Sequence, residues 1–298
     1  MSAEQIANYA NDNVDKSDAE AKAVLGQLIA KQARVTDLMT IATKAGLNED
    51  DARKLAEGNA DDSDVQFQMK IEQWKVDSAL QEAKSLKGVY AFNTENKLVE
   101  QSGSSAVSTR NRLTNASRNH KIIYNQPYSV VVGAYNGDVS YNNETGHIFS
   151  DSRSINFEIR GLKTKEEDLP AIGSATYTGL AFNGTIGMKR VEKQENLFGS
   201  TYTSYDYIDE VIGGKLSYTV NFDNKTGSGS ITGLGDVIHL SNGSIVGTGI
   251  SSTANQSYKT GNYYLNFYGL KAEEIAGKVS LDGKDIIGFG GTRGEIKK

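Results

Sequence analysis

The chain has 298 residues, enough to bury a core in one large domain or two ordinary ones without help from disulfides or metals. Its net charge of -5 and its scattered Lys and Arg make a nucleic-acid partner unexpected, because such partners need clustered cations. The absence of Cys excludes disulfides, thiolate metal sites and a Cys nucleophile, and it favours a bacterial rather than a eukaryotic surface protein.

The N-terminus carries no recognisable targeting segment. No run of about 18 apolar residues occurs that would predict a transmembrane helix. The first twenty residues also lack the basic start and apolar run of a signal peptide. Our hypothesis is that Met1 initiates a trimmed, mature chain from which a leader and a lipid-bearing Cys were removed.

Residues 1–95 predict a helical segment, called the handle below. Ser17 and Glu20 have the spacing of a capping box, which predicts a helix start. Apolar residues then recur at three- and four-residue steps, as expected for one face of a helix, and Gly46 is expected to end it. Asn48 is expected to cap a short second helix that closes at Gly58.

A third helix is predicted to begin near Ser63. Phe67, Ile71 and Trp74 form an apolar stripe, which we expect to pack against the first helix as an antiparallel hairpin. Core packing is the favoured interpretation of Trp74, the only Trp in the chain. The alternative is that Trp74 and Phe67 are exposed anchors on a partner-binding face.

Residues 96–169 predict a linker and accessory strands. The polar stretch 95–119 is weakly periodic and is interpreted as a linker or irregular crossing. The segments 121–124, 128–133 and 154–159 are typical of strands, which we expect to form a small sheet or to lie beside a barrel.

Residues 170–298 predict an eight-stranded antiparallel barrel, so the fold class is α+β. Asn242-Gly243 and Asp282-Gly283 are expected to form two-residue turns, and 223–227 a longer one. Closing the strands into a barrel removes exposed edges. The predicted strands are 174–182, 215–223, 227–232, 236–240, 244–251, 262–268, 273–280 and 285–290.

No pattern of a catalytic or metal site is found. His120, His147 and His239 have no metal-ligand spacing, and the sequence has neither a phosphate-binding Gly loop nor a GxSxG elbow. We therefore predict no metal, no cofactor and no enzyme activity. His147 lies on a predicted loop and could ligate haem iron, although a solvated loop His is the favoured interpretation.

The insertion between the first two barrel strands, roughly residues 183–214, is long for a compact barrel. It contains Tyr202, Tyr205 and Tyr207 among Ser, Thr, Asp and Gly, a composition that recognition loops use. Partner binding through these tyrosines and a merely solvated, mobile hairpin are equally weighted.

Four segments, 175–182, 214–222, 227–231 and 267–277, resemble the C-terminal barrel of a group of surface lipoproteins; the last reads FYGLKAEEIAG. The group contains transferrin-binding protein B, factor H-binding protein and the hemophilins. The resemblance implies an eight-stranded barrel, no catalysis, a lipid anchor in the bacterial outer membrane, display on the cell surface and export by a Slam-type outer-membrane translocator. The helical handle departs from the β-rich handles of most members and resembles that of a host-colonisation lipoprotein.

Two functions follow from this resemblance. The first is host association, in which the handle, the Tyr-rich insertion or both bind a host or cell-surface macromolecule. The alternative is nutrient capture of the hemophilin type, in which His147 or His120 near the handle–barrel junction holds haem. A third, weaker interpretation is an accessory subunit for an outer-membrane partner.

Overall fold

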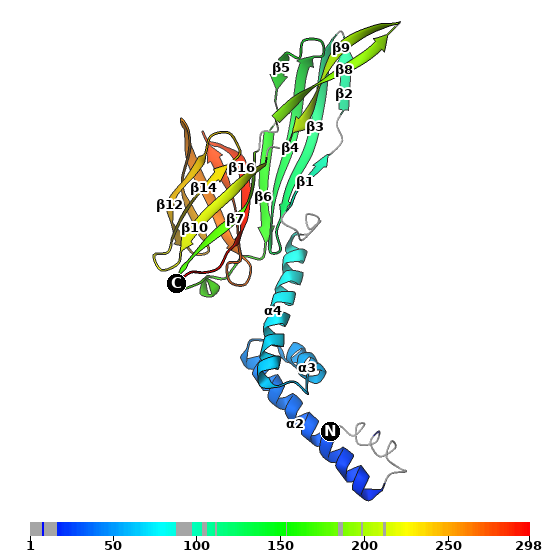
Figure 1. Ribbon diagram of the computed structural model, residues 1–298, viewed down its shortest axis with the longest axis vertical. Helices are drawn as coiled ribbons and strands as arrows, with labels where there is room; N and C mark the ends of the chain where they lie inside the picture. Colours follow the sequence, from blue (N-terminus) through cyan, green and yellow to red (C-terminus); the bar gives the residue numbers. More distant parts are fainter. Residues whose placement is uncertain are drawn as a thin grey trace. The chain divides into compact units, whose positions relative to one another are not determined.

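The computed structural model describes residue 8 and residues 17–87, 97–102, 106–110, 112–152, 154–183, 187–197, 199–210 and 213–298. Its internal contacts divide the chain into two compact units, Met1–Ser78 and Ala79–Lys298. The first unit is helical and the second consists mainly of strands (Figure 1). This confirms the predicted α+β class, in which helices precede a closed antiparallel barrel. The domain boundaries expected near residues 95 and 169 stay predictions.

The helices begin at the polar caps that the sequence predicts. Among the described residues they are α2 (Asp18–Lys44), α3 (Glu49–Gly58) and α4 (Asp64–Lys87). The Ser17 backbone N–H donates to the Glu20 carboxylate at 3.0 Å, and the Asp51 N–H donates to the Asn48 side chain at 2.9 Å. These contacts satisfy N–H groups that have no partner within the helix. No helix in this described part is long and apolar enough to cross a membrane.

The predicted antiparallel hairpin between the first and third helices is wrong in its extent. On α4, Phe67, Ile71 and the partly buried Trp74 share a core with the C-terminal half of α2 and with α3. Leu28 and Ile29, in the first half of α2, are 39% and 56% exposed. The stripe itself belongs to this one core; past Ser78, Ala79 and Ala83 of α4 pack with strands of the second unit.

Eight strands close into an antiparallel barrel in the second unit (Figure 1). In pairing order they are β10 (Gly213–Asn221), β11 (Thr226–Thr232), β12 (Ile238–Val246), β13 (Gly249–Gln256), β14 (Lys259–Tyr268), β15 (Glu274–Leu281), β16 (Lys284–Arg293) and β7 (Ser174–Asn183). Because β7 pairs with both β10 and β16, the ring has no unpaired edge that could recruit another chain.

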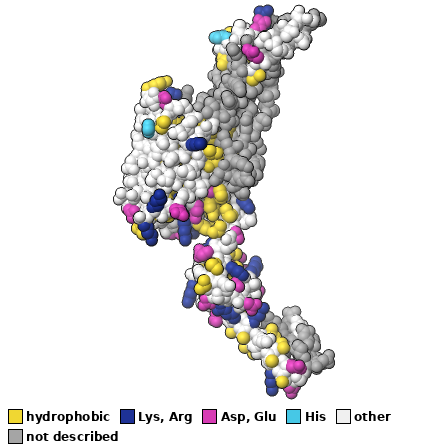
Figure 2. All heavy atoms as spheres, viewed as in Figure 1, with side chains coloured by type: hydrophobic (Ala, Val, Ile, Leu, Met, Phe, Trp, Pro, Cys, Tyr) yellow, Lys and Arg dark blue, Asp and Glu magenta, His cyan; other side chains and the backbone are white. Residues whose placement is uncertain are grey.

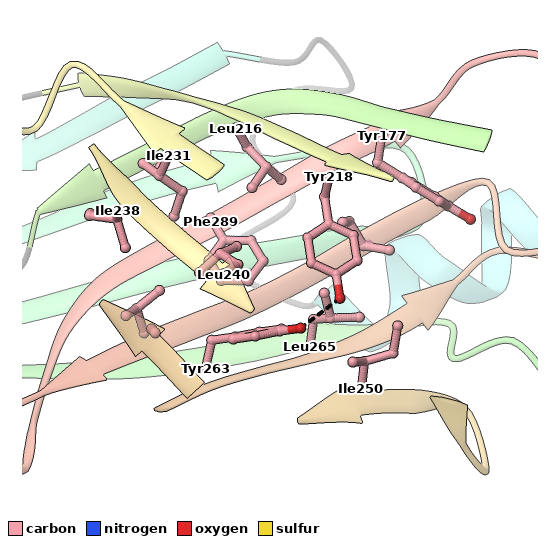
Figure 3. Packing of buried hydrophobic residues seen from close by; sticks show 14 of the residues in the cluster. Tyr177, Leu216, Tyr218, Ile231, Ile238, Leu240, Ile250, Tyr263, Leu265 and Phe289 are labelled. Carbon is pink, nitrogen blue, oxygen red and sulfur yellow. Dashed lines mark hydrogen bonds between the residues drawn. The ribbon is translucent and has the colours of Figure 1, made fainter. Parts of the chain in front are cut away.

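Side chains fill the barrel interior. Along β10, Leu216, Tyr218 and Val220 are buried and alternate with exposed residues, as expected for a strand with one dry face. The Tyr218 and Tyr263 hydroxyls form a hydrogen bond of 2.8 Å inside the core (Figure 3). An eight-stranded barrel is narrow enough for such side chains to occupy its centre.

The turn predicted at Asn242-Gly243 is wrong. Both residues lie inside β12, where the pairing with β13 shifts between Leu240 and Ile245. The chain reverses instead at Gly247, which has a φ of 56°. Gly243 is needed for close packing, since a Cβ there would lie 2.8 Å from Cγ2 of Ile250. The turn predicted at 282–283 is confirmed by φ values of 51° and 76°.

A six-stranded antiparallel sheet precedes the barrel, so the predicted linker at 95–119 is wrong. The strands are β1 (Lys97–Ser102), β2 (Ala106–Arg110), β3 (Leu113–Asn125), β4 (Ser129–Asn142), β5 (Ile148–Asp151) and β6 (Ser154–Gly161). The long strands β3 and β4 pair with each other; β1 and β2 pair with β3, and β5 and β6 with β4. The start of β3 escaped prediction because its buried positions hold Thr114 and Ala116, which give almost no apolar period.

The insertion between β7 and β10 is a regular two-stranded ribbon rather than an irregular loop. It consists of β8 (Gly187–Leu197) and β9 (Ser200–Glu210), which pair without a register shift from Gly187 and Glu210 to Leu197 and Ser200. Gly199 has a φ of 82° at the turn, which favours glycine. The insertion is therefore a β-hairpin, and the choice between partner binding and a solvated, mobile hairpin stays a prediction.

Candidate binding surface

Two glycines of β16 bring the six-stranded sheet against the barrel wall. A Cβ on Gly288 would lie 2.5 Å from the Phe157 ring, and a Cβ on Gly290 would lie 2.7 Å from the Gln126 amide nitrogen. The backbone of β16 is therefore part of the contact surface. Phe157 also packs on Phe182 of β7, with ring centroids 5.4 Å apart. Sheet and barrel thus share one buried core.

Glu274, the first residue of β15, is a carboxylate buried at this contact and only 1% exposed. The Ser129 hydroxyl donates to one carboxylate oxygen at 2.7 Å, and the Tyr128 N–H donates to the other at 3.0 Å. Burial raises the pKa of Glu274 to about 7, opposed in part by these hydrogen bonds and by the charge of Lys87. The carboxylate therefore joins β15 to the link between β3 and β4.

Lys87, the last residue of α4, belongs to the same buried cluster. Its ammonium donates to Oδ1 of Asn125 at 2.8 Å. Burial lowers the pKa of Lys87 to about 8, and the negative charge of Glu274 opposes that decrease. Because both charged groups are enclosed, we interpret the cluster as a structural clamp and not as a ligand site.

A groove of about 550 Å³ lies on the outer wall of the barrel. Strands β7, β10 and β11 contribute most of its lining, and Tyr124 of β3 contributes the rest. The strand register arranges side chains in rows across the three strands, because alternate residues of a strand face the same side. One row is Thr178, Ser217 and Ser230, and the next is Leu180, Lys215 and Thr232.

Tyr124 connects the groove to the docked sheet. Its side chain is fully buried, yet its hydroxyl donates no hydrogen bond to any described residue. Burial raises the pKa of Tyr124 to about 12, and a hydrogen bond from the Leu180 backbone opposes the increase. The groove therefore combines four hydroxyl side chains and one ammonium with a buried phenol whose donor is unused.

The sequence-predicted residues of the handle are buried to different degrees. Phe67 has no exposed surface and Trp74 is partly buried against the same core, which supports core packing as the role of both side chains. Hydrophobic side chains nevertheless appear among mixed charges on the visible face of the helical segment (Figure 2). A contact of Trp74 or Phe67 with a partner stays a prediction.

Of the predicted tyrosines and histidines, only His147 and His239 have side chains that the structure describes, and neither lines the groove. Tyr202, Tyr205 and Tyr207 have backbones in β9, and their side chains lie outside the described part of the structure. The His120 backbone pairs with Tyr135 in the sheet, and its side chain is likewise not described. His147 is exposed after β4, where its ring and that of Phe149 are nearly perpendicular with centroids 5.0 Å apart.

No group of three or more His, Cys, Asp or Glu among the described residues is placed to hold a metal ion. The groove and the clamp were both missed by the sequence reasoning. The only available signal for the groove was the alternation of hydroxyl residues in the barrel strands. The only signal for the clamp was Glu274 inside the distinctive 267–277 segment, where its burial could not be read from the sequence.

Comparison with protein families gives one match, over residues 167–279, to a family model described as "Factor H binding protein, C-terminal". The barrel from β7 into β15 matches the factor H binding protein C-terminal family. This match runs from the short 3-10 helix η2 (Glu166–Asp168) into β15 and covers less than half of the 298 residues. A comparison with curated proteins finds no match.

Several solved structures are distantly similar. The haemoglobin receptor HpuA from Kingella denitrificans is 14% identical with a TM-score of 0.36, over 69% of this chain and 89% of that chain. Transferrin binding protein B from Neisseria meningitidis is 14% identical with a TM-score of 0.38, over 63% and 35%. A variant from Haemophilus parasuis is 17% identical with a TM-score of 0.38, over 64% and 39%. The chain spans well under half of these transferrin binding proteins, and we draw no functional conclusion from such distant similarity.

Proposed function

We propose that this protein is a non-catalytic binding protein that captures a host macromolecule through its outer surface. The observation that carries the proposal is the match of residues 167–279 to a family named for binding factor H. The packed interior of the barrel is in keeping with it, because Tyr218, Tyr263 and their neighbours occupy the space in which a small ligand would lie. Binding would then use the outer wall, the ribbon or the helices.

The proposal extends to the location of the protein. The family resemblance supports a lipid anchor in the bacterial outer membrane, display on the cell surface and export by a Slam-type translocator. The pairing of a helical handle with this barrel resembles the host-colonisation lipoprotein NilC. We therefore propose host association as the biological role, with specificity in the handle and in the β8–β9 ribbon.

A capture experiment on the full chain tests this function. The immobilised protein is exposed to host surface extract and to host serum, and bound components are identified and titrated. We expect saturable binding of a host protein that weakens in the double variant Tyr205→Ser, Tyr207→Ser. Tyr258→Ser is the matched control, because Tyr258 is an 87% exposed tyrosine on a barrel turn. No saturable binding from either source would overturn the proposal.

Haem capture through His147 or His120 is the alternative function. A haem titration of the full chain, followed through the Soret band, separates the two. Host association predicts no spectral shift at micromolar haem, whereas a shift that is lost in His147→Ala or His120→Ala would replace host association by haem capture.

A further inference from the structure

The groove beside Tyr124 has the chemical features of a sugar site. We propose that this groove, on the outer wall of β7, β10 and β11, binds a carboxylated sugar. The inference goes beyond the proposed function, because it concerns a small carbohydrate and needs no protein partner.

The hydroxyl side chains of the groove suit a polyhydroxylated ligand. Thr178, Ser217 and Ser230 lie in one row of paired residues across three strands. Each hydroxyl can donate one hydrogen bond and accept others, so each can exchange hydrogen bonds with a sugar hydroxyl. Leu180, in the neighbouring row, adds apolar surface against which the C–H face of a sugar ring can lie.

The charge of the groove favours an anion. Among the described residues that line the groove, Lys215 is the only charged one, and none is Asp or Glu. Its side chain forms no ion pair with any residue that the structure describes. A carboxylate on the ligand would form a charge-assisted hydrogen bond with this ammonium, which is stronger than a bond between neutral groups.

Tyr124 is the observation that distinguishes the groove from an ordinary polar strand surface. Its side chain is fully buried, and its hydroxyl donates no hydrogen bond to any described residue. Buried polar groups in native proteins are nearly always paired, so an unused donor at a groove indicates a partner that completes it. A carboxylate or hydroxyl oxygen of a bound sugar would accept this hydrogen bond.

The size of the groove agrees with this ligand class. Its volume of about 550 Å³ lies within the range of about 300–1,000 Å³ that small-molecule sites occupy. Carboxylated sugars occur both on host glycans, as sialic acid, and in polysaccharides built with uronic acids. The shared feature is the ring with hydroxyls and one carboxylate, so the experiment must contain both sources.

The full chain is titrated calorimetrically with 3′-sialyllactose, with a hyaluronan tetrasaccharide that carries glucuronate, and with neutral lactose. We expect one carboxylated sugar to bind at millimolar concentration or below and lactose to bind about tenfold more weakly or not at all. Binding of 3′-sialyllactose alone identifies sialic acid of host glycans as the ligand, and binding of the hyaluronan tetrasaccharide alone identifies a uronic acid of a polysaccharide. Failure of both at millimolar concentration would overturn the inference.

Three variants test the position of the site. Lys215→Gln and Tyr124→Phe are each expected to weaken binding about tenfold, and Ser217→Trp to abolish it by filling the groove. The matched controls are Lys259→Gln on β14 and Thr253→Trp on the exposed face of β13, and circular dichroism checks that all variants fold. Sugar binding that Ser217→Trp leaves intact, or that the controls weaken equally, would place the ligand elsewhere. Since the titration contains no host protein, its outcome is independent of the capture experiment.

Discussion

Neutralising Glu274 should remove a pH dependence of stability that the buried clamp creates. The pKa of this carboxyl rises from its ordinary 4.5 to about 7 in the folded protein. At about 1.4 kcal/mol for each unit of pKa, burying the ionised form costs the folded state about 3 kcal/mol. Because the folded protein holds the proton more tightly than the unfolded chain does, the free energy of unfolding decreases as pH rises from about 4.5 to about 7.

Lys87 acts in the opposite direction at higher pH. Its pKa decreases from 10.5 to about 8 on folding, so the neutral amine favours the folded state. The contribution of Lys87 to the free energy of unfolding therefore increases between about pH 8 and pH 10.5. The combined contribution of Glu274 and Lys87 to the free energy of unfolding is therefore lowest between about pH 7 and pH 8.

The assay is denaturant unfolding at pH 5 and at pH 8, followed by far-ultraviolet circular dichroism of the β-rich second unit. Between these pH values the free energy of unfolding of the wild-type protein should decrease by about 2.5 kcal/mol more than that of Glu274→Gln. Glu273→Gln, the neighbouring and less buried carboxylate, is the matched control and should keep the wild-type loss. Fluorescence of Trp74, which lies in the helical unit, should show no such difference between variants. Equal pH dependence in Glu274→Gln and wild type would refute this account of the clamp.

Three further substitutions test the packing. Phe67→Ala should destabilise the helical unit by about 3–5 kcal/mol because the ring is fully buried; Trp74 fluorescence measures this, and an unchanged unfolding midpoint would contradict it. Gly290→Val should lower the free energy of unfolding by about 3 kcal/mol, because even its Cβ would lie only 2.7 Å from the Gln126 side chain on the docked sheet. Denaturant unfolding followed by circular dichroism measures this, and an unchanged stability would mean that the contact is not formed. Tyr218→Phe should cost about 1 kcal/mol by removing the hydrogen bond to Tyr263, whereas an unchanged or increased stability would show that this bond contributes nothing.

The features predictable from sequence were those determined by near neighbours in the chain. The start of α2 follows from Ser17 and Glu20, three residues apart, and the cap of α3 follows from Asn48. The alternation of Leu216, Tyr218 and Val220 likewise placed β10 with one face buried. In each case the deciding contact is local, so the pattern is complete within a few residues.

The errors arise where a distant segment decides. Asn242-Gly243 has turn chemistry, but Ile250 on the next strand packs over Gly243, and the chain continues through both residues as β12. Residues 113–119 give no apolar period, yet each pairs with a residue of β4, and this pairing makes them part of a strand. Backbone pairing of this kind leaves little trace in side-chain hydrophobicity.

The groove illustrates the same limit for function. Ser217, exposed on β10, and Ser230, half-buried on β11, are unremarkable in the sequence, and either would be interpreted as solvated surface. They become part of a groove only because β3 brings Tyr124 to the barrel wall, and β3 can reach that wall because Gly290 carries no side chain. The candidate site therefore depends on the docking of two sheets, and a substitution that blocks docking should remove the groove while leaving every hydroxyl that lines the barrel strands in place.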